Sequence, residues 1–205
     1  TLRIRESCFG EKHVTVLQSL ITLGHIHVKF STSSDAHACG ARYFYRAAKL
    51  GEIVLSKTSV IVGACTHLFL TWTETIVITK RTEIVTCREE MIRVWIEICK
   101  HKHGRSSDEV ICWYEKLAKL YICIHEEWRA TVVYKELYEI IVIRYGKKSP
   151  EAGRIGAFFG TLDIVLKGEE AEKGICELET FIFETTEELD IHSHLCIAMM
   201  IKLAW

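Results

Sequence analysis

Histidine and cysteine side chains recur two residues apart in this chain, and such pairs could hold a metal ion. Three His-x-His pairs and two pairs that include cysteine are present: His25/His27, His101/His103, His192/His194, His194/Cys196 and His37/Cys39. Zinc takes four ligands of these types, but structural sites usually place two or more residues between paired ligands. Residues two apart on a helix point about 200° apart. We therefore interpret the pairs as helix-end and surface side chains and predict no bound metal. The best metal candidates are His192, His194 and Cys196.

Cys123 and His125 could form a nucleophilic thiolate and its base, because an imidazole activates a neighbouring thiol. Their spacing separates them on a helix, whereas a catalytic dyad is normally assembled from distant segments. We therefore predict that Cys123 packs in the core. The chain contains no G-x-S-x-G, H-E-x-x-H or G-x-G-x-x-G motif. These observations predict that the protein is not an enzyme and needs no cofactor.

The segment Gly-Glu-Ile-Val-Leu-Ser-Lys-Thr at residues 51–58 comes within one residue of a phosphate-binding loop. That loop requires a second glycine, where backbone amides wrap the phosphates, and Ser56 stands there instead. The residues between are apolar and β-branched, which suits such a wrap poorly. We interpret the segment as a turn between two helices.

The composition is that of a globular chain with almost no helix-breaking residue. Hydrophobic residues make up 49% and charged residues 26%, and Pro150 is the single proline. Long helices are therefore permitted, because proline breaks them. Lys and Arg total 26 against 27 Asp and Glu, so the net charge of −1 provides no basic surface for phosphates or anionic lipids. We expect neither nucleic acid nor membrane as a partner.

The apolar runs at residues 60–64 and 140–143 are far shorter than the roughly 20 residues of a membrane span. Nine cysteines, an odd number scattered along the chain, favour free thiols in a reducing compartment. We predict a soluble, cytoplasmic protein in which most cysteines fill the core as small apolar side chains. Since the chain starts at Thr1 and stops at Trp205 inside an apolar helical pattern, we expect a fragment of a longer array.

An internal repeat is the strongest signal in the sequence. Turn-like segments centre on Gly10, Ser56, Gly104 and Gly146, and a fifth is predicted near Asp190. Thirteen residues after each of the first four turns stands a large apolar residue, followed by a small or apolar one: Leu23-Gly24, Phe69-Leu70, Leu117-Ala118 and Phe159-Gly160. The spacing from turn to turn is roughly 45 residues, which is the length of a helical hairpin with its loops.

The residues of these turns are typical of helix ends. Glycine after an apolar helical run supplies the left-handed residue that closes a helix. Ser149-Pro150-Glu151 combines a capping serine, a proline suited to the first helical position and a carboxylate facing the positive end of the helix dipole. We predict similar helix starts at Ser107 and Ser34.

One unit, residues 107–146, carries a large-Leu-small-Tyr pattern on its first helix and an Ala-large-Leu pattern on its second: Tyr114, Leu117, Ala118 and Tyr121, then Ala130, Tyr134 and Leu137. This pattern resembles the tetratricopeptide (TPR) repeat, in which small residues let the two helices of a hairpin approach closely. It departs at Leu137, where a small residue would stand. Other units match less well, with His27 and Asp163 where an aromatic residue is expected. The long period and the Tyr-Gly-x-x-Ser-Pro turn are similar to the repeats of kinesin light chains.

The resemblance implies an all-α fold, an α–α superhelix (solenoid) of tandem TPR-like helical hairpins forming one domain over residues 1–205. Such stacks present a concave groove lined mainly by first helices, so the implied function is a scaffold that binds a protein or peptide segment. In the best-matched unit, the residues one turn off the packing face are Cys112, Glu115 and Lys119, and the analogous residues of the next unit are Arg154 and Thr161. We predict that these five residues contact the partner.

Three alternatives stay open. The β-branched stretches at residues 58–62 and 75–79 favour strands, so a mixed α/β fold is the main alternative. A structural subunit could instead associate through open ends of the stack, where apolar residues would be exposed: Leu2, Ile4, Met199, Met200, Leu203 and Trp205. A metal-binding or enzymatic protein is the third alternative.

Overall fold

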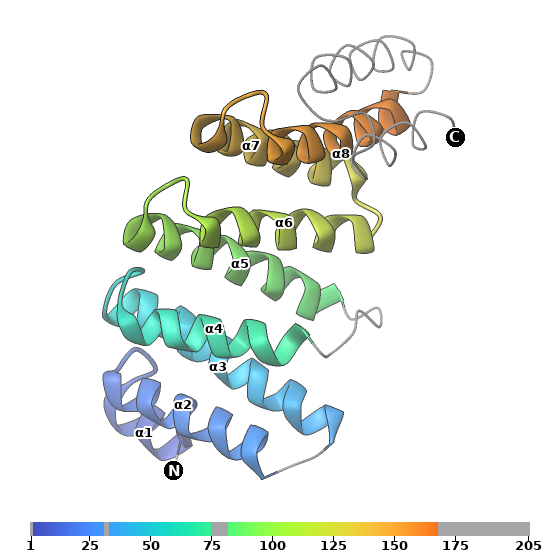
Figure 1. Ribbon diagram of the computed structural model, residues 1–205. Coiled ribbons are helices and arrows are strands. Elements are labelled where there is room, and N and C mark those ends of the chain that lie inside the picture. Colours follow the sequence, from blue (N-terminus) through green and yellow to red (C-terminus); the bar gives the residue numbers. More distant parts are fainter. Residues whose placement is uncertain (1, 31–32, 75–81, 168–205) are drawn as a thin grey trace. The chain divides into compact units, whose positions relative to one another are not determined.

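The computed structural model describes residues 2–30, 33–74 and 82–167, which form helices and contain no strand (Figure 1). Eight α-helices run through this described part: α1 (Leu2–Phe9), α2 (Val14–Lys29), α3 (Ser34–Val54), α4 (Val60–Glu74), α5 (Thr82–His103), α6 (Asp108–Cys123), α7 (Glu127–Tyr145) and α8 (Pro150–Lys167). The chain divides into two compact units between Lys102 and His103. Helix α5 therefore completes the first unit and α6 begins the second.

The helix ends follow the turn residues closely. Gly10, Gly104 and Gly146 have φ of +81°, +92° and +90°, a backbone conformation that suits glycine. Ser107 caps α6 by accepting a hydrogen bond from the Val110 amide at 3.4 Å. The predicted serine cap of α8 is also present, because Ser149 accepts from the Ala152 amide and Pro150 is the first helical residue.

The start of α3 is a correction. The capping side chain there is Ser33, which accepts from the Ala36 amide at 3.2 Å, and the predicted Ser34 is the first helical residue. Ser33 has the extended backbone (φ −84°, ψ 140°) that a capping residue adopts, so the helix begins one residue earlier than a cap at Ser34 would place it.

In the first unit, α2 packs on α3 and α3 packs on α4, and the buried side chains between them include Leu17, Phe44 and Val62. Two glycines allow α2 and α3 to approach closely. A Cβ atom added at Gly24 would lie 2.7 Å from the Phe44 ring, and one at Gly40 would lie 2.6 Å from Val28 and 3.1 Å from the Gly24 carbonyl oxygen. The spacing of this hairpin therefore depends on the absence of both side chains.

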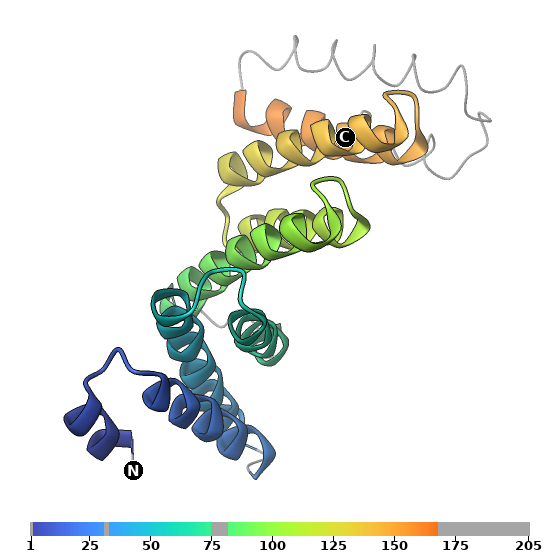
Figure 2. The ribbon, with the colours of Figure 1, turned by 90° about the vertical axis from the view of Figure 1, so that its left-hand side faces the viewer.

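In the second unit, α6 packs on α7 and α7 packs on α8 (Figure 2). All seven residues of the pattern that resembles the TPR repeat are buried in the α6–α7 hairpin: Tyr114, Leu117, Ala118, Tyr121, Ala130, Tyr134 and Leu137. Leu137 is fully buried although a small residue is expected at its position, so this hairpin accommodates a large side chain there.

The strand signal at residues 58–62 is wrong, because Val60 begins α4. Val62, Cys65 and Thr66 are almost fully buried on one side of this helix, so packing overrides the β-branched propensity. Residues 75–79 lie outside the described residues.

The prediction that most cysteines fill the core is also wrong for the described part of the chain. Cys65 and Cys99 are buried, but Cys8, Cys112 and Cys123 are exposed. Cys123 is the last residue of α6, where the helix leaves the core. Burial raises the pKa of the Cys65 thiol to about 11, so that thiol stays protonated and unreactive at neutral pH.

Candidate functional site

The predicted partner-binding residues of α6 lie on one side of that helix. Cys112, Glu115 and Lys119 are spaced by three and four residues, which places them on a common face. Cys112 and Lys119 are exposed and Glu115 is half-buried, whereas Leu117 and Ala118 on the opposite side are buried. Within the described residues, Lys119 makes no ion pair. This face of α6 therefore points away from the hairpin core, as the prediction requires.

The structure brings two of the predicted residues into direct contact. The Arg154 guanidinium on α8 donates a hydrogen bond to Glu115 Oε1 on α6 at 2.5 Å. Both helices are the first of their hairpins, so the ion pair joins the first helices of consecutive repeats. We name the patch of Cys112, Glu115, Lys119 and Arg154 the α6–α8 surface. Thr161 lies seven residues after Arg154 on α8 and therefore at a position of the same helical face.

Tyr134 of α7 lies close enough to this ion pair to feel the charges of both residues. Its ring stacks on Phe158 of α8, with ring centroids 5.7 Å apart and planes 7° from parallel. Burial raises the pKa of the Tyr134 phenol; the charge of Glu115 raises it further, and the charge of Arg154 opposes that rise. This aromatic stack joins α7 to α8, and Tyr134 is buried, so α8 and its Arg154 are held against the second helix of the preceding hairpin.

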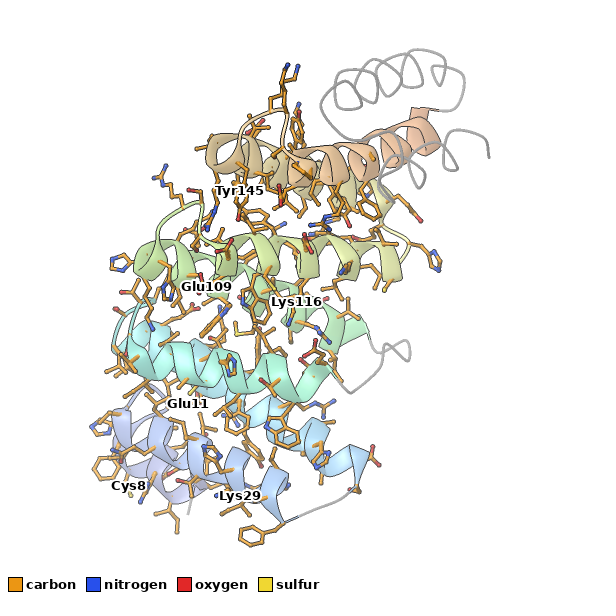
Figure 3. All side chains as sticks on the ribbon, viewed as in Figure 1. Cys8, Glu11, Lys29, Glu109, Lys116 and Tyr145 are labelled. Carbon is orange, nitrogen blue, oxygen red and sulfur yellow. The ribbon has the colours of Figure 1, made fainter. Side chains whose placement is uncertain are left out.

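Two features next to this surface were not found by sequence reasoning. Lys116, one turn from Cys112 on α6 (Figure 3), places its ammonium 4.4 Å from the centroid of the Trp113 ring. At the start of α6, Asp108 accepts hydrogen bonds from Arg144 and from the Tyr145 hydroxyl, both at 2.7 Å. The Asp108 hydrogen bond raises the pKa of the Tyr145 phenol. The sequence offers one hint of the Asp108 contacts: α6 and α7 form one hairpin, so the end of α7 lies beside the start of α6.

A second polar cluster lies in the first unit, between α3 and α5. Glu90 accepts hydrogen bonds from the Tyr45 hydroxyl at 2.7 Å and from the Lys49 ammonium at 2.6 Å. Burial alone would raise the pKa of Glu90, but the bonds from Lys49 and Tyr45 lower it below its usual value. Burial and the bond to Glu90 raise the pKa of Tyr45. Tyr45 and Lys49 both donate to Glu90, so the cluster joins α3 to α5. We therefore assign it a structural role and not a chemical one.

The histidine pairs do not assemble a metal site in the described part of the chain. His25 meets the Phe44 ring edge to face at 5.1 Å, and His27 stacks on Tyr43 at 5.3 Å. No group of three potential ligands is found among the described residues. His192, His194 and Cys196 lie outside them, so that metal prediction stays untested.

The other chemical candidates also take structural positions. Residues 51–58 form the end of α3 and the turn before α4, as predicted. Cys123 and His125 are both exposed at the turn after α6, and the His125 ring lies 3.8 Å from Glu127. Among the described helices, none is both long and apolar enough to span a bilayer.

No protein-family model and no curated protein matches the sequence. One similar solved structure is that of the nearly identical TPR-like repeats of a Podosopora anserina protein assigned as a kinesin light chain. It is 12% identical, with a TM-score of 0.52, and the match covers 92% of this chain and 84% of that chain. A single-residue variant of those repeats is also 12% identical, with coverages of 91% and 84% and a TM-score of 0.49. The first similarity shows that this chain has the TPR-like helical-repeat fold, and with the helices described above it confirms the predicted all-α class.

Proposed function

We propose that this protein is an interaction scaffold that binds a protein or peptide segment across the α6–α8 surface. TPR-like repeats typically serve as protein-interaction scaffolds, because stacked hairpins expose the faces of their first helices. The observation that carries the proposal is the contact between Glu115 and Arg154. Glu115 and Arg154 were predicted separately as partner-binding residues of two consecutive repeats, and their side chains are in contact.

The chemistry of this surface suits an extended polypeptide. The contact with Glu115 uses one N–H group of the Arg154 guanidinium, which has five, so further donors can serve a carbonyl or carboxylate. Lys119 adds a second cation and the exposed Cys112 adds a small apolar contact. Mixed charges of this kind contribute specificity more than affinity. We expect binding that weakens with salt, since exposed charges are screened at high ionic strength.

The first experiment is native mass spectrometry of the chain purified gently from its host. A retained peptide is then sequenced, synthesised and titrated against the purified chain. We expect the variants Lys119→Glu and Arg154→Gln to bind it at least about tenfold more weakly, the loss expected when a charged hydrogen bond is removed. Lys135→Glu is the matched control, because Lys135 is exposed on α7 away from this surface. Equal affinities for all four proteins would contradict the proposal.

Self-association is a second candidate function, and the exposed apolar residues of α1 favour it. Ile4 is 66% exposed and Phe9 is 56% exposed, and no residue of α1 is buried. Concentration-dependent sedimentation of the wild type, lost in Ile4→Glu, would support this candidate. A monomer at all concentrations would exclude it.

A further inference from the structure

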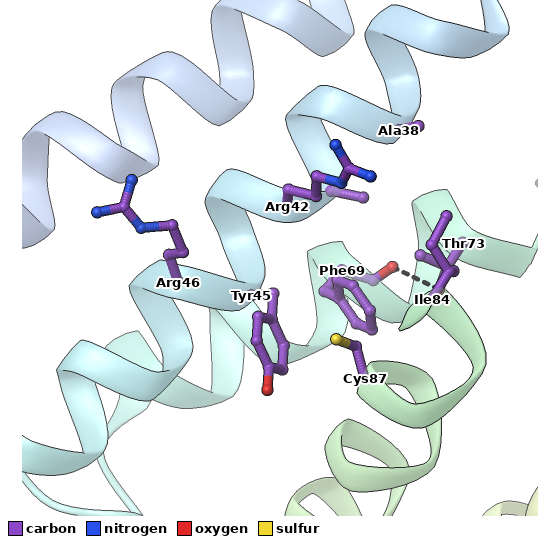
Figure 4. Close-up of a pocket in the computed structure, with 9 residues that line it drawn as sticks. Ala38, Arg42, Tyr45, Arg46, Phe69, Thr73, Ile84 and Cys87 are labelled. Atoms are coloured by element: carbon purple, nitrogen blue, oxygen red, sulfur yellow. Dashed lines mark hydrogen bonds between the residues drawn. The ribbon is translucent and has the colours of Figure 1, made fainter. Parts of the chain in front are cut away.

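A small apolar cavity opens between α3, α4 and α5 of the first unit (Figure 4). Its volume is about 240 Å³, and the lining residues are Ala38, Ala41, Arg42, Tyr45, Arg46, Phe69, Thr73, Ile84 and Cys87. An apolar cavity of roughly 150 Å³ is enough to bind benzene, whereas sites for drug-sized ligands occupy about 300 to 1,000 Å³. The cavity therefore has room for a single ring or a short alkyl chain.

The hydroxyl groups of the cavity wall are already used by the protein. Thr73 donates its hydroxyl hydrogen to the Phe69 carbonyl oxygen at 2.8 Å, and Tyr45 donates to Glu90 at 2.7 Å. Each hydroxyl has only one hydrogen to donate. A polar ligand group inside the cavity would give up its hydrogen bonds to water and would receive none from these hydroxyl groups, which costs free energy. The interior therefore favours the apolar part of a ligand.

The charged residues of the cavity are arginines, and they lie along one helix. Arg42 and Arg46 are four residues apart on α3 and both are exposed. The Arg46 guanidinium points away from Phe69 and Cys87 (Figure 4), and it donates to Glu6 Oε1 at 3.1 Å. Among the lining residues described, none is acidic. Two guanidinium groups therefore border the cavity, and one of them, that of Arg46, already binds a carboxylate.

We propose that this cavity binds a small amphipathic organic anion, with its alkyl or aromatic part between Phe69 and Ile84 and its carboxylate against Arg42. The apolar lining favours a ligand with an alkyl or aromatic part, and the guanidinium of Arg42 favours a ligand with a negative charge. This site lies in the first unit and shares no residue with the α6–α8 surface, so it stands independently of the proposed function.

The test is titration of the full chain with straight-chain carboxylates from butanoate to dodecanoate, followed by calorimetry. Each added methylene buried in the cavity is expected to tighten binding about fourfold, until the cavity is full and the affinity levels off. NMR of the Ala38, Ala41 and Ile84 methyl groups locates the ligand, since all three line the cavity. Octanol, which has the same body as octanoate and no charge, separates the apolar contribution from the ionic one.

Variants of the cavity complete the test. Ala38→Leu on α3 and Cys87→Leu on α5 fill the space from opposite walls, and each should abolish binding while circular dichroism shows an intact helical fold. Arg42→Gln should weaken octanoate about tenfold and leave octanol unchanged. Arg105→Gln, a change at an exposed arginine in the second unit, is the matched control and should bind like the wild type.

Three results would overturn the proposal. Absence of octanoate binding at millimolar concentration would rule out a small-anion site, and binding that survives both filling variants would show that the cavity is not where octanoate binds. Equal losses of octanoate and octanol in Arg42→Gln would remove the role of the charge. If octanoate is inactive but an acidic peptide carrying a leucine shifts the same methyl groups, the cavity serves a peptide and the assignment to a small anion is wrong.

Discussion

Replacing Gly40 by alanine tests whether the close approach of α2 and α3 is required by the fold. The added Cβ would lie 2.6 Å from Val28 Cγ2 and 3.1 Å from the Gly24 carbonyl oxygen. The carbonyl belongs to the backbone of α2 and cannot rotate away, so the helices must separate. Overpacking of this kind lowers the free energy of unfolding by up to about 3 kcal/mol. The higher helix propensity of alanine raises it by about 1 kcal/mol. We expect a net loss of about 2 kcal/mol.

Urea denaturation followed by circular dichroism measures this loss, with an unchanged dependence on urea concentration. The thermal midpoint should fall by about 4 to 8 °C for a chain of this size. Gly63→Ala is the matched control, because Gly63 is also buried in a helix but a Cβ there would lie 3.6 Å from Trp95, an ordinary contact. That control should gain up to about 1 kcal/mol. Changes of the same sign and size in both variants would refute the reasoning.

Three further predictions concern polar contacts. A double-mutant cycle between Glu115→Gln and Arg154→Gln should give a coupling below about 1 kcal/mol that shrinks with salt, because the pair is partly exposed; a coupling unaffected by salt would contradict this. Because the pKa of folded Glu90 is lowered, its contribution to stability is present above the usual glutamate pKa and is lost as pH falls below it. Glu90→Gln should therefore flatten the acid limb of the stability profile measured by urea denaturation; an unchanged acid limb would show that Glu90 does not contribute. Ser107→Ala should cost about 1 kcal/mol by removing the cap of α6, whereas Ser56→Ala in an exposed turn should leave the denaturation midpoint unchanged; equal effects of the two changes would contradict the capping role.

Much of the local structure follows from residues whose conformational preference is strong. Gly10, Gly104 and Gly146 mark helix ends because few other residues adopt their positive φ, and Pro150 marks a helix start because its φ is already helical. The buried face of α6 also follows from the sequence, since large and small apolar residues recur at helical spacing. The cap of α3 was misplaced by one residue because Ser33 and Ser34 have equal capping propensity.

The contacts between repeats could not be derived in the same way, although the repeat length contains a hint of them. Four of the polar side-chain pairs in contact across helices lie 39 to 45 residues apart in the chain, close to one repeat: Glu115 with Arg154, Glu6 with Arg46, Lys49 with Glu90 and Tyr45 with Glu90. Pairing residues one period apart would have suggested these contacts. The cavity between α3, α4 and α5 carries no such signal, because its volume depends on how three helices fit together.

The pattern of helix packing has a consequence for how the chain folds. The helix pairs with extensive contact in the described part are all neighbours in sequence: α1 with α2, α2 with α3, α3 with α4, α6 with α7 and α7 with α8. Closing a short loop costs little entropy, so contacts between neighbouring helices can form within a single early step. Chains dominated by such contacts fold in microseconds to milliseconds, and their hairpins can nucleate separately and then propagate along the array. A change in one hairpin should therefore alter the folding rate of that hairpin and leave a distant one able to form at its own pace.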